Sequence, residues 1–434
     1  MDSPWPGRPA RYAGDINGWC GAAVGAEVFA TLRKGDLKTV SNSFDVVVVG
    51  AGVVGASAAF HLAKLGGARV CVVDRGPVCG GGTAKSCAIV RSHYSIATNT
   101  EFTLASLEMF HNFQDYLGDG EIDSGFVNSG YLIVAGEGEL AGRLKTNLDM
   151  QAGVGAETYE IDKAEAKRLH PGIRLDDVAL IGYEPKSGYA DPYLTTTGFM
   201  KAARNLGVEL RTECEALQIL TEGGKVTGLR TSQGDIHAGQ VLLAVGPWTR
   251  RLANGTIPDL PLEVSRHVVL TFRGAAPYGK TTPIVKDLTT ANKMYFRPAS
   301  GGVVLVGTGD HGDPVTSPDA MDENTPEDLV LLQGGQLSRR VEGFQDAELT
   351  ASWIGPYDIT PDWNPVLGPV EAVPGLSIAY GFSGHGFKLA PAVGKALAQS
   401  MLGQATVVPL EGYRLGRFAD NELLRGAYGI GSIS

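Results

Sequence analysis

The chain has 434 residues, 43% of them apolar and 19% charged, which fits a globular protein too long for one compact core and predicts two domains. Its net charge of −10 at pH 7 argues against nucleic acid as a partner, because phosphate binding requires clustered Lys and Arg. The longest apolar run, Val46–Phe60, falls short of the ~20 residues of a membrane span, and five cysteines without metal-ligand spacing favour a reduced, cytoplasmic setting.

Residues 1–42 differ from the rest of the chain, because they show little apolar periodicity. We expect an N-terminal arm here, either disordered or produced by a start codon placed too early. A basic region followed by a long apolar core and a cleavage site, the marks of a signal peptide, is not evident.

A nucleotide-binding pattern runs from Phe44 to Asp74. It predicts a buried strand at Val46–Val49, a glycine turn, a helix at Val54–Leu65 and a second strand at Arg69–Val73 that ends on an acid. The glycines, the strand–helix–strand context and an acid about 20 residues on together make the full dinucleotide-binding fingerprint. Asp74 lies where a carboxylate can accept hydrogen bonds from a ribose.

Three glycines in this pattern have separate roles. Gly50 lets the chain turn sharply off the strand, Gly52 lets the backbone approach a pyrophosphate, and Gly55 lets the helix pack tightly on the strand. The N-terminus of this helix, with Val53 and Val54, then presents N–H groups to the phosphates. The alternative is an ordinary buried unit whose glycines only aid packing.

The middle of the chain alternates helical and strand patterns, and residues 89–94 enter a helix or an extended segment. Asp191 and Pro192 open one helix, as N-cap and first helical residue. The predicted helices are Glu101–Tyr116, Gly138–Met150, Asp162–Leu169 and Pro192 to about Leu206. The predicted strands are Val127–Ala135, Glu209–Glu213, Ala216–Thr221, Lys225–Ser232 and Gln240–Ala244, the last ending in a turn at Gly246.

From Leu262 to Trp353 the pattern becomes strand-rich and predicts a mostly antiparallel sheet. Its elements are strands at Glu263–Phe272, Lys293–Arg297 and Gly302–Gly307 and one helix at Pro326–Val341. The chain then returns to strand, glycine loop and helix, at Leu376–Tyr380, residues 381–386 and Phe387–Leu402. Two glycine loops, one near each end of the chain, thus each join a strand to a helix and predict one nucleotide site built from both ends.

Five motifs occur in an order typical of one superfamily: DVVVVGAGVVGASAAFHL, the Asp191 and Pro192 pair, VLLAVGPW, TPDWNPVLG at Thr360–Gly368 and YGFSGHGFKLAPAVGKALA at Tyr380–Ala398. From Ser43 to about Gly403, the chain resembles the flavin-dependent amine and amino-acid oxidoreductases of the D-amino-acid oxidase, glycine oxidase and sarcosine oxidase superfamily. GFSGHGFK and TAKSCAIVRSHYS are most similar to sarcosine oxidase, of the monomeric and beta-subunit types.

The resemblance implies a fold of α/β plus α+β class. A Rossmann-like FAD-binding domain, discontinuous in sequence, would accompany a mostly antiparallel substrate-binding domain. We assign residues 43–125, 184–258 and 356–410 to the FAD-binding domain, and residues 126–183 and 259–355 to the substrate-binding domain. Residues 411–434 would form a C-terminal tail.

The resemblance also implies FAD rather than NAD. The first glycine loop would take the pyrophosphate, Asp74 the adenosine ribose, and the loop at Gly384 and Gly386 the flavin end. A helix that begins at Phe387 favours the negative charge that reduced flavin carries on its pyrimidine side. The other cofactor-binding positions that we expect are Arg75, Gly82, Thr83, Ser86, Cys87, Gly246, Trp248, Gly355, His385 and Lys388.

By the same resemblance, Arg91 and Lys388 would clamp a substrate carboxylate. A guanidinium offers a bidentate fork and an ammonium a point charge, and together they would direct the substrate Cα–H toward flavin N5. The alternatives are a surface or phosphate-facing arginine and a solvated helix lysine. His385 beside the flavin and Tyr357 on the substrate side complete the expected catalytic set, each with a purely structural role as its alternative. No metal site is predicted.

Two departures from the family pattern limit what the resemblance implies. Monomeric sarcosine oxidases attach the flavin through a cysteine before the TPD motif, and Gly355 stands there; related dehydrogenases use a histidine where Lys85 stands. We therefore expect non-covalent FAD. The oxygen-activating lysine of the family is also missing, with Leu305 near its place and Lys286 or Lys293 as substitutes that no spacing singles out.

These observations predict an FAD-dependent oxidation of an amino acid or N-substituted amino acid. The α-carbon would give a hydride to flavin N5, and the resulting imine would hydrolyse. The alternatives are a 2-hydroxy-acid dehydrogenase and a non-catalytic flavoprotein subunit of a larger complex. The expected partners are a small amino-acid substrate, O2 or a redox carrier as electron acceptor, and other subunits of a homo- or hetero-oligomer, with no nucleic acid and no membrane span.

Overall fold

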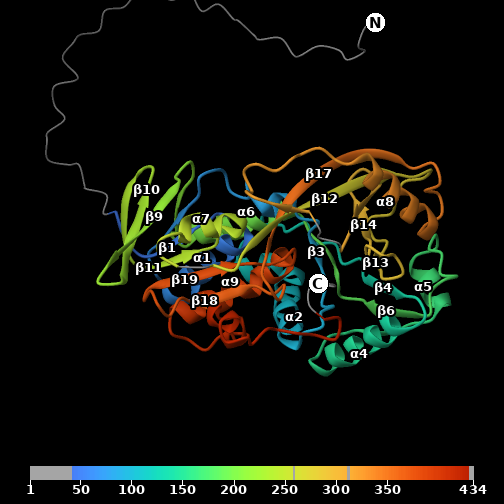
Figure 1. Cartoon of the computed structure of the whole chain (residues 1–434), viewed down its shortest axis with the longest axis horizontal. Coiled ribbons are helices and arrows are strands. Elements are labelled where there is room, and N and C mark those ends of the chain that lie inside the picture. Colours follow the sequence, from blue (N-terminus) through green and yellow to red (C-terminus); the bar gives the residue numbers. More distant parts are fainter. Residues whose placement is uncertain (1–41, 258–259, 310–312, 430–434) are drawn as a thin grey trace, which may run out of the picture. The chain divides into compact units, whose positions relative to one another are not determined.

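A computed structural model describes residues 42–257, 260–309 and 313–429 of the chain (Figure 1). Two large sheets and the helices beside them make up this part. The expectation of an N-terminal arm concerns residues 1–41, which lie outside the described residues. Among the helices of the described ranges, none is long and apolar enough to cross a membrane.

The first sheet is parallel in its centre, with the strand order β18-β19-β11-β1-β2-β8. Val48 in β1 lies opposite Val72 in β2 and Leu242 in β11. All three are fully buried, as expected for parallel strands covered on both faces. The strands are β1 (Ser43–Val49), β2 (Val70–Val73), β8 (Glu209–Arg211), β9 (Ala216–Glu222), β10 (Lys225–Thr231), β11 (Gly234–Leu243), β18 (Val366–Pro369) and β19 (Leu376–Tyr380).

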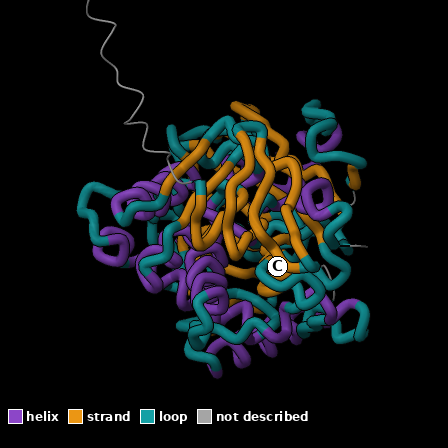
Figure 2. Tube along the Cα trace, turned by 90° about the vertical axis from the view of Figure 1, so that its left-hand side faces the viewer, coloured by secondary structure: helices purple, strands orange, loops and turns teal. Residues whose placement is uncertain are grey.

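Helices α1 (Val53–Gly66) and α9 (Gly386–Met401) pack on this sheet and on each other, and α6 (Pro192–Asn205) packs on α1. The hydroxyl of Ser57 in α1 donates a hydrogen bond to the carbonyl of Pro391 in α9 at 3.0 Å. Figure 2, which faces the end of the molecule that carries β9 and β10, shows the strands side by side with helices beside them. The N-cap prediction for α6 is confirmed, because Asp191 accepts from the N–H of Leu194 at 2.9 Å.

One predicted helix is divided in two. The pattern over Glu101–Tyr116 forms α2 (Ala97–His111) and α3 (Phe113–Leu117), separated at Asn112. The side chain of Asn112 donates to the carbonyl of Glu108 at 3.0 Å, and such local hydrogen bonds compete with the helical backbone. Residues 89–94 were expected to enter either a helix or an extended segment. The structure shows the extended form at their start, where β3 (Ile89–Val90) pairs with β7 (Gly188–Tyr189).

The second sheet has the order β16-β12-β15-β14-β13-β4-β6-β5, with β17 beside β12. Its ladders are antiparallel except between β13 and β4, so the predicted sheet type is confirmed. The strands are β4 (Tyr131–Ala135), β5 (Tyr159–Glu160), β6 (Leu180–Glu184), β12 (Glu263–Arg273), β13 (Ile284–Asp287), β14 (Tyr295–Ala299), β15 (Val303–Gly307), β16 (Pro314–Val315) and β17 (Glu348–Ile359). The helices beside it are α4 (Glu139–Gly153), α5 (Lys163–Leu169) and α8 (Glu327–Arg340).

The sequence analysis missed β17, the strand that borders the site described below. It carries Gly355 and Pro356, which interrupt the strand pattern, but it pairs with β12 along its whole length. The strands β6 and β13 were missed as well. Both β6 and β17 run across predicted domain boundaries, at 183/184 and 355/356, and the division into two domains stays a prediction.

The C-terminal segment is folded onto the TPDWNP motif. Arg417 donates to Asp362 through Nε at 2.8 Å and Nη2 at 2.9 Å, and both side chains are buried. The N–H of Leu424 donates to the same carboxylate at 3.0 Å. The motif that supports the family resemblance therefore holds the tail in place.

Candidate functional site

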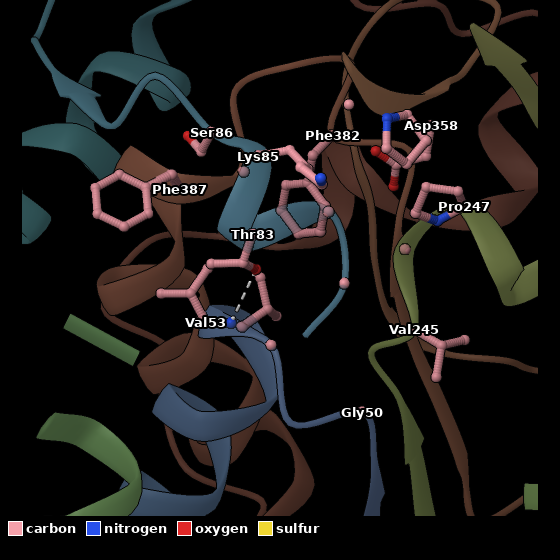
Figure 3. Close-up of a pocket in the computed structure, with 18 of the residues that line it drawn as sticks. Gly50, Val53, Thr83, Lys85, Ser86, Val245, Pro247, Asp358, Phe382 and Phe387 are labelled. Carbon is pink, nitrogen blue, oxygen red and sulfur yellow. Dashed lines mark hydrogen bonds between the residues drawn. The ribbon is translucent and has the colours of Figure 1, made fainter. Parts of the chain in front are cut away.

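A cavity of about 410 Å³ lies between the first glycine loop, β17 and the start of α9 (Figure 3), within the size range of small-molecule sites. Segments far apart in the sequence form its wall. They lie within residues 49–54, 73–91, 214–217, 244–252, 286–309, 355–358 and 379–388, with Tyr131 from β4.

The first glycine loop has the geometry that its sequence predicts. Gly50 has φ +107°, a conformation that L side chains rarely adopt, and a Cβ there would collide with the carbonyl of Ala244. A Cβ on Gly55 would collide with the carbonyl of Gly50. Gly55 therefore brings the helix close to the loop and does not itself line the cavity.

The N-terminus of α1 faces the cavity with N–H groups to offer. Its N-cap is Gly52, which has no side chain that could cap the helix. The N–H of Val53 donates to Oγ1 of Thr83 at 3.3 Å, the dashed line in Figure 3, and Val54 also lines the cavity. A helix N-terminus of this kind binds phosphate, because its N–H groups lack partners within the helix and its dipole is positive there.

Asp74 follows β2 and lies at the same end of the cavity. Its carboxylate accepts hydrogen bonds from the N–H groups of Ala51 at 2.7 Å and Gly76 at 2.8 Å. Each carboxylate oxygen retains acceptor capacity, so hydroxyl groups of a ribose can still bind.

Arg75 and Trp248 meet beside this acid. The guanidinium carbon of Arg75 lies 4.7 Å from the centre of a Trp248 ring, and both side chains donate to Oδ1 of Asp319, at 2.7 and 2.8 Å. The sequence analysis missed Asp319, because its contacts join segments at least 70 residues apart.

The second glycine loop bends sharply before α9. Gly384 has φ +87°, and a Cβ there would overlap the ring of Tyr357, which therefore packs directly on the loop. The N–H of Gly381 donates to Oδ2 of Asp358 at 2.7 Å. Burial raises the pKa of Asp358 to about 6. The sequence analysis missed this acid, which Figure 3 places on the cavity wall near Phe382 and Pro247.

Three cationic side chains from different elements line the cavity: Arg91 after β3, Lys286 in β13 and Lys388 in the first turn of α9. Each residue is at most 6% exposed. Burial, and then the charges of Arg91 and Lys286, hold the pKa of Lys388 well below its usual range. Burial, followed by the charge of Arg91, lowers the pKa of Lys286 to about 7. The site thus repels added positive charge and favours an anion.

Aromatic rings support these cations. The ring centre of Tyr94 lies 4.8 Å from the guanidinium carbon of Arg91 and 5.8 Å from Nζ of Lys388. Arg91 also donates to the carbonyl of His93. Nζ of Lys286 lies 5.3 Å from the ring centre of Tyr295. Rings at these distances attract cations and exclude water.

The structure brings most of the predicted site residues to this one cavity. His385 and Gly55 are the predicted residues that do not line it, and His385 is buried with its ring centre 5.5 Å from that of Tyr94. The predicted residues that line the cavity are Gly50, Gly52, Val53, Val54, Asp74, Arg75, Gly82, Thr83, Ser86, Cys87, Arg91, Gly246, Trp248, Gly355, Tyr357, Gly384, Gly386, Phe387 and Lys388.

These features together define a class of protein. Two strand–glycine loop–helix units meet over one cavity, with a helix N-terminus suited to phosphate and an acid suited to ribose at one end and buried cations also lining it. The residues therefore fit a dinucleotide cofactor together with an anionic substrate. A dinucleotide-binding oxidoreductase is the class that this arrangement supports.

Comparison with known proteins gives the family. Residues 45–400 match the FAD dependent oxidoreductase family, DAO, and the chain belongs to that family. FAD is the cofactor that membership implies, and the residues of the cavity fit it. The predicted resemblance to the D-amino-acid oxidase, glycine oxidase and sarcosine oxidase superfamily is confirmed.

Individual relatives align over most of the chain. FAD-dependent oxidoreductase domain-containing protein 1 of Bos taurus is 29% identical, over 86% of this chain and 84% of its own. Sarcosine oxidase subunit beta of an Arthrobacter species is 25% identical, over 88% of this chain and 93% of its own. The crystal structure of L-proline dehydrogenase from P. horikoshii superposes with a TM-score of 0.80 at 27% identity, covering 88% of this chain and 99% of that one.

Proposed function

We propose that this FAD-dependent oxidoreductase oxidises an amino acid or an N-substituted amino acid at the carbon beside the nitrogen. The observation that carries the proposal is the pair of buried cations, Arg91 and Lys388, at one cavity. Support comes from relatives whose names state such substrates: sarcosine oxidase subunit beta, glycine oxidase, 4-methylaminobutanoate oxidase and L-proline dehydrogenase.

The two cations suit a carboxylate. Arg91 offers a planar fork of donors and Lys388 a point charge. Both are buried, and a buried charge without a counter-ion is costly. Lys388 also lies in the first turn of α9, where the helix dipole disfavours a cation. A substrate carboxylate offsets both penalties, because it supplies the missing negative charge.

The chain then acts by orientation. FAD, when bound, would supply the two-electron acceptor for the hydride of the C–H bond next to nitrogen, while the amine would lose a proton and water would hydrolyse the imine product. Arg91 and Lys388 hold the carboxylate so that this C–H bond faces the acceptor. Tyr357, packed on the second glycine loop, closes the cavity wall beside them and excludes water.

A 2-hydroxy acid is the second candidate substrate, because the same cations would hold its carboxylate. The names of the relatives favour the amine. A non-catalytic role is a third candidate, since the pyruvate dehydrogenase phosphatase regulatory subunit of Mus musculus is 24% identical over 82% of this chain. The electron acceptor, the assembly with other subunits and the cytoplasmic location stay predictions.

The test is anaerobic reduction of the bound flavin by N-methyl, cyclic and D- or L-amino acids, by the matching hydroxy acids and by decarboxylated amines. Arg91→Met and Lys388→Met should each lower the reduction rate constant over Kd by about tenfold to a hundredfold for the acid, since a charged hydrogen bond contributes about 1.5–3 kcal/mol. The plain amine should change little, and FAD content should stay constant.

The outcomes separate the candidates. If both Arg91→Met and Lys388→Met reduce their flavin with the best acid substrate as fast as the wild type does, the carboxylate clamp is wrong. Equal losses for acid and amine mean that the residues serve the flavin. Reduction by hydroxy acids alone supports the second candidate, and no reduction by any compound supports the regulatory role.

A further inference from the structure

A third buried cation lies at the same cavity, and the carboxylate clamp does not use it. Lys286 stands in β13 between β14 and β4, opposite Tyr295 and Ile133. Its neighbours in the strand, Ile284 and Val285, are fully buried, while Lys286 itself lines the cavity at 4% exposure. The strand therefore directs one ammonium group into the substrate space.

Within the part of the chain that the structure describes, no carboxylate forms an ion pair with this ammonium. Among the hydrogen bonds of the described residues, none has Nζ of Lys286 as donor. The adjacent Asp287 is held by Arg340, with Oδ2 2.8 Å from Nε and Oδ1 3.3 Å from Nη2. Arg340 lies in α8 and is not among the residues that line the cavity. Asp287 is thus committed to another partner.

Nζ of Lys286 lies beside a glycine of the cavity wall. A Cβ on Gly309 would lie 3.0 Å from Nζ of Lys286, so a side chain at that position would crowd the ammonium. Gly309 itself lines the cavity. Because Gly309 has no side chain, it leaves room beside the ammonium of Lys286.

Cationic groups outnumber acidic ones in this part of the cavity, although the buried carboxyl of Glu184 also acts on Arg91. Arg91, Lys286 and Lys388 carry up to three positive charges in one buried space, and each repels the others. One carboxylate at Arg91 and Lys388 leaves Lys286 without a counter-ion. The charge of Arg91 lowers the pKa of both lysines.

We infer that the substrate carries a second carboxylate, which Lys286 binds while Arg91 and Lys388 hold the first. This inference rests on the proposed function and adds the substrate class, an amino or imino dicarboxylate. The second carboxylate would neutralise the remaining charge and accept a hydrogen bond from the ammonium, a contact that a buried ion pair requires to be favourable.

The test compares matched pairs of substrates in the FAD-loaded protein: aspartate with 2-aminobutyrate, glutamate with norvaline, and iminodiacetate with N-ethylglycine. The readout is the anaerobic flavin reduction rate constant over Kd. Wild type should favour the diacid of the best pair at least tenfold, in line with one charged hydrogen bond. Lys286→Met should lower the value for the diacid at least tenfold more than that for the monoacid, and Lys286→Arg should retain most of the preference.

A second readout does not depend on turnover. Succinate and butyrate, which carry no amine, should perturb the flavin spectrum on binding, with succinate the tighter ligand in wild type and no tighter than butyrate in Lys286→Met. Lys280→Met, which removes an exposed lysine just before β13, serves as the matched control and should behave as wild type. FAD content and Tm confirm that each variant is folded.

The results discriminate between the two proposals. Reduction by monoacids with no preference for the diacid in any pair overturns the second carboxylate but leaves the amine oxidation intact. An equal loss for diacid and monoacid in Lys286→Met also overturns it, because the lysine then serves the flavin or the shared carboxylate. If no amine reduces the flavin, both proposals fail together.

Discussion

The Asp74 carboxylate accepts a hydrogen bond from the backbone N–H of Ala51 at 2.7 Å. This contact joins the end of β2 to the glycine loop that precedes α1. The acid therefore holds this glycine loop in place while it faces the cavity, and its substitution should affect cofactor binding more than folding.

Asp74→Ala should weaken FAD binding at least tenfold, because it removes the expected ribose acceptor and two supports of the loop. The loss of folding stability should be about 1–3 kcal/mol, less than the stability of a typical domain. FAD per protein after purification and a Kd by titration of apo-protein measure the effect. Asp45→Ala is the control, since Asp45 also accepts a backbone N–H, from Arg69 at 2.8 Å, but does not line the cavity. Full FAD retention in Asp74→Ala would contradict the ribose role.

The flavin should be released by acid precipitation, because the position that would carry a cysteine link holds Gly355. A Cβ at Gly355 would lie 2.8 Å from the Cβ of Lys85, so the two candidate attachment positions face each other and neither carries a cysteine or a histidine. The measurement is the absorbance of the supernatant. Colour that stays in the pellet would reveal a covalent bond, and Cys87→Ser would then show whether this cavity cysteine forms it.

Lys286→Met should stabilise the substrate-free protein, most strongly at neutral and lower pH. Burial lowers the pKa of Lys286 to about 7, and the charges of Arg91 and Lys293 add to this effect. The charge of Asp287 opposes it more weakly. Lys388 is a further cation that interacts with Lys286. Between about pH 7 and the usual lysine pKa near 10.5, the unfolded chain holds a proton that the native state has released, so wild-type stability rises with pH there.

The destabilisation caused by the buried charge of Lys286 is therefore fully present below about pH 7 and is lost as the pH approaches 10.5. Lys286→Met should raise the free energy of unfolding by about 3–5 kcal/mol at pH 6.5 and by much less at pH 9.5. Thermal unfolding of both proteins at the two pH values measures this. An equal gain at both would show that Lys286 does not titrate in this window.

Arg417→Met should release the C-terminal segment. The side chain is fully buried against Asp362, and removal of one member of a buried ion pair costs about 3–5 kcal/mol because the other charge is left unpaired. A lower Tm and proteolytic cleavage near residues 413–424 are the expected results. Arg414→Met, which breaks exposed pairs with Asp420 and Glu422, should change Tm little. Equal effects in the two variants would argue against the buried pair.

Local sequence patterns were informative where local physics decides the structure. The fingerprint from Phe44 to Asp74 correctly predicted two strands, a helix and the loop between them, because apolar periodicity and glycine conformation act over a few residues. The cap at Asp191 succeeded for the same reason. Asn112 was a local signal that was overlooked, since its side chain ends α2 by bonding to the backbone of its own helix.

The sequence by itself predicted the strand–glycine loop–helix unit, the family, and Arg91 and Lys388 as residues of one site, which both line the cavity. Only the tertiary structure decided that β17 runs beside β12, that Asp319 binds Arg75 and that Lys286 joins Arg91 and Lys388 at one cavity. The reason is physical: these contacts join segments far apart in the chain, and their energies come from burial and charge in a shared space, which no local pattern along the sequence encodes.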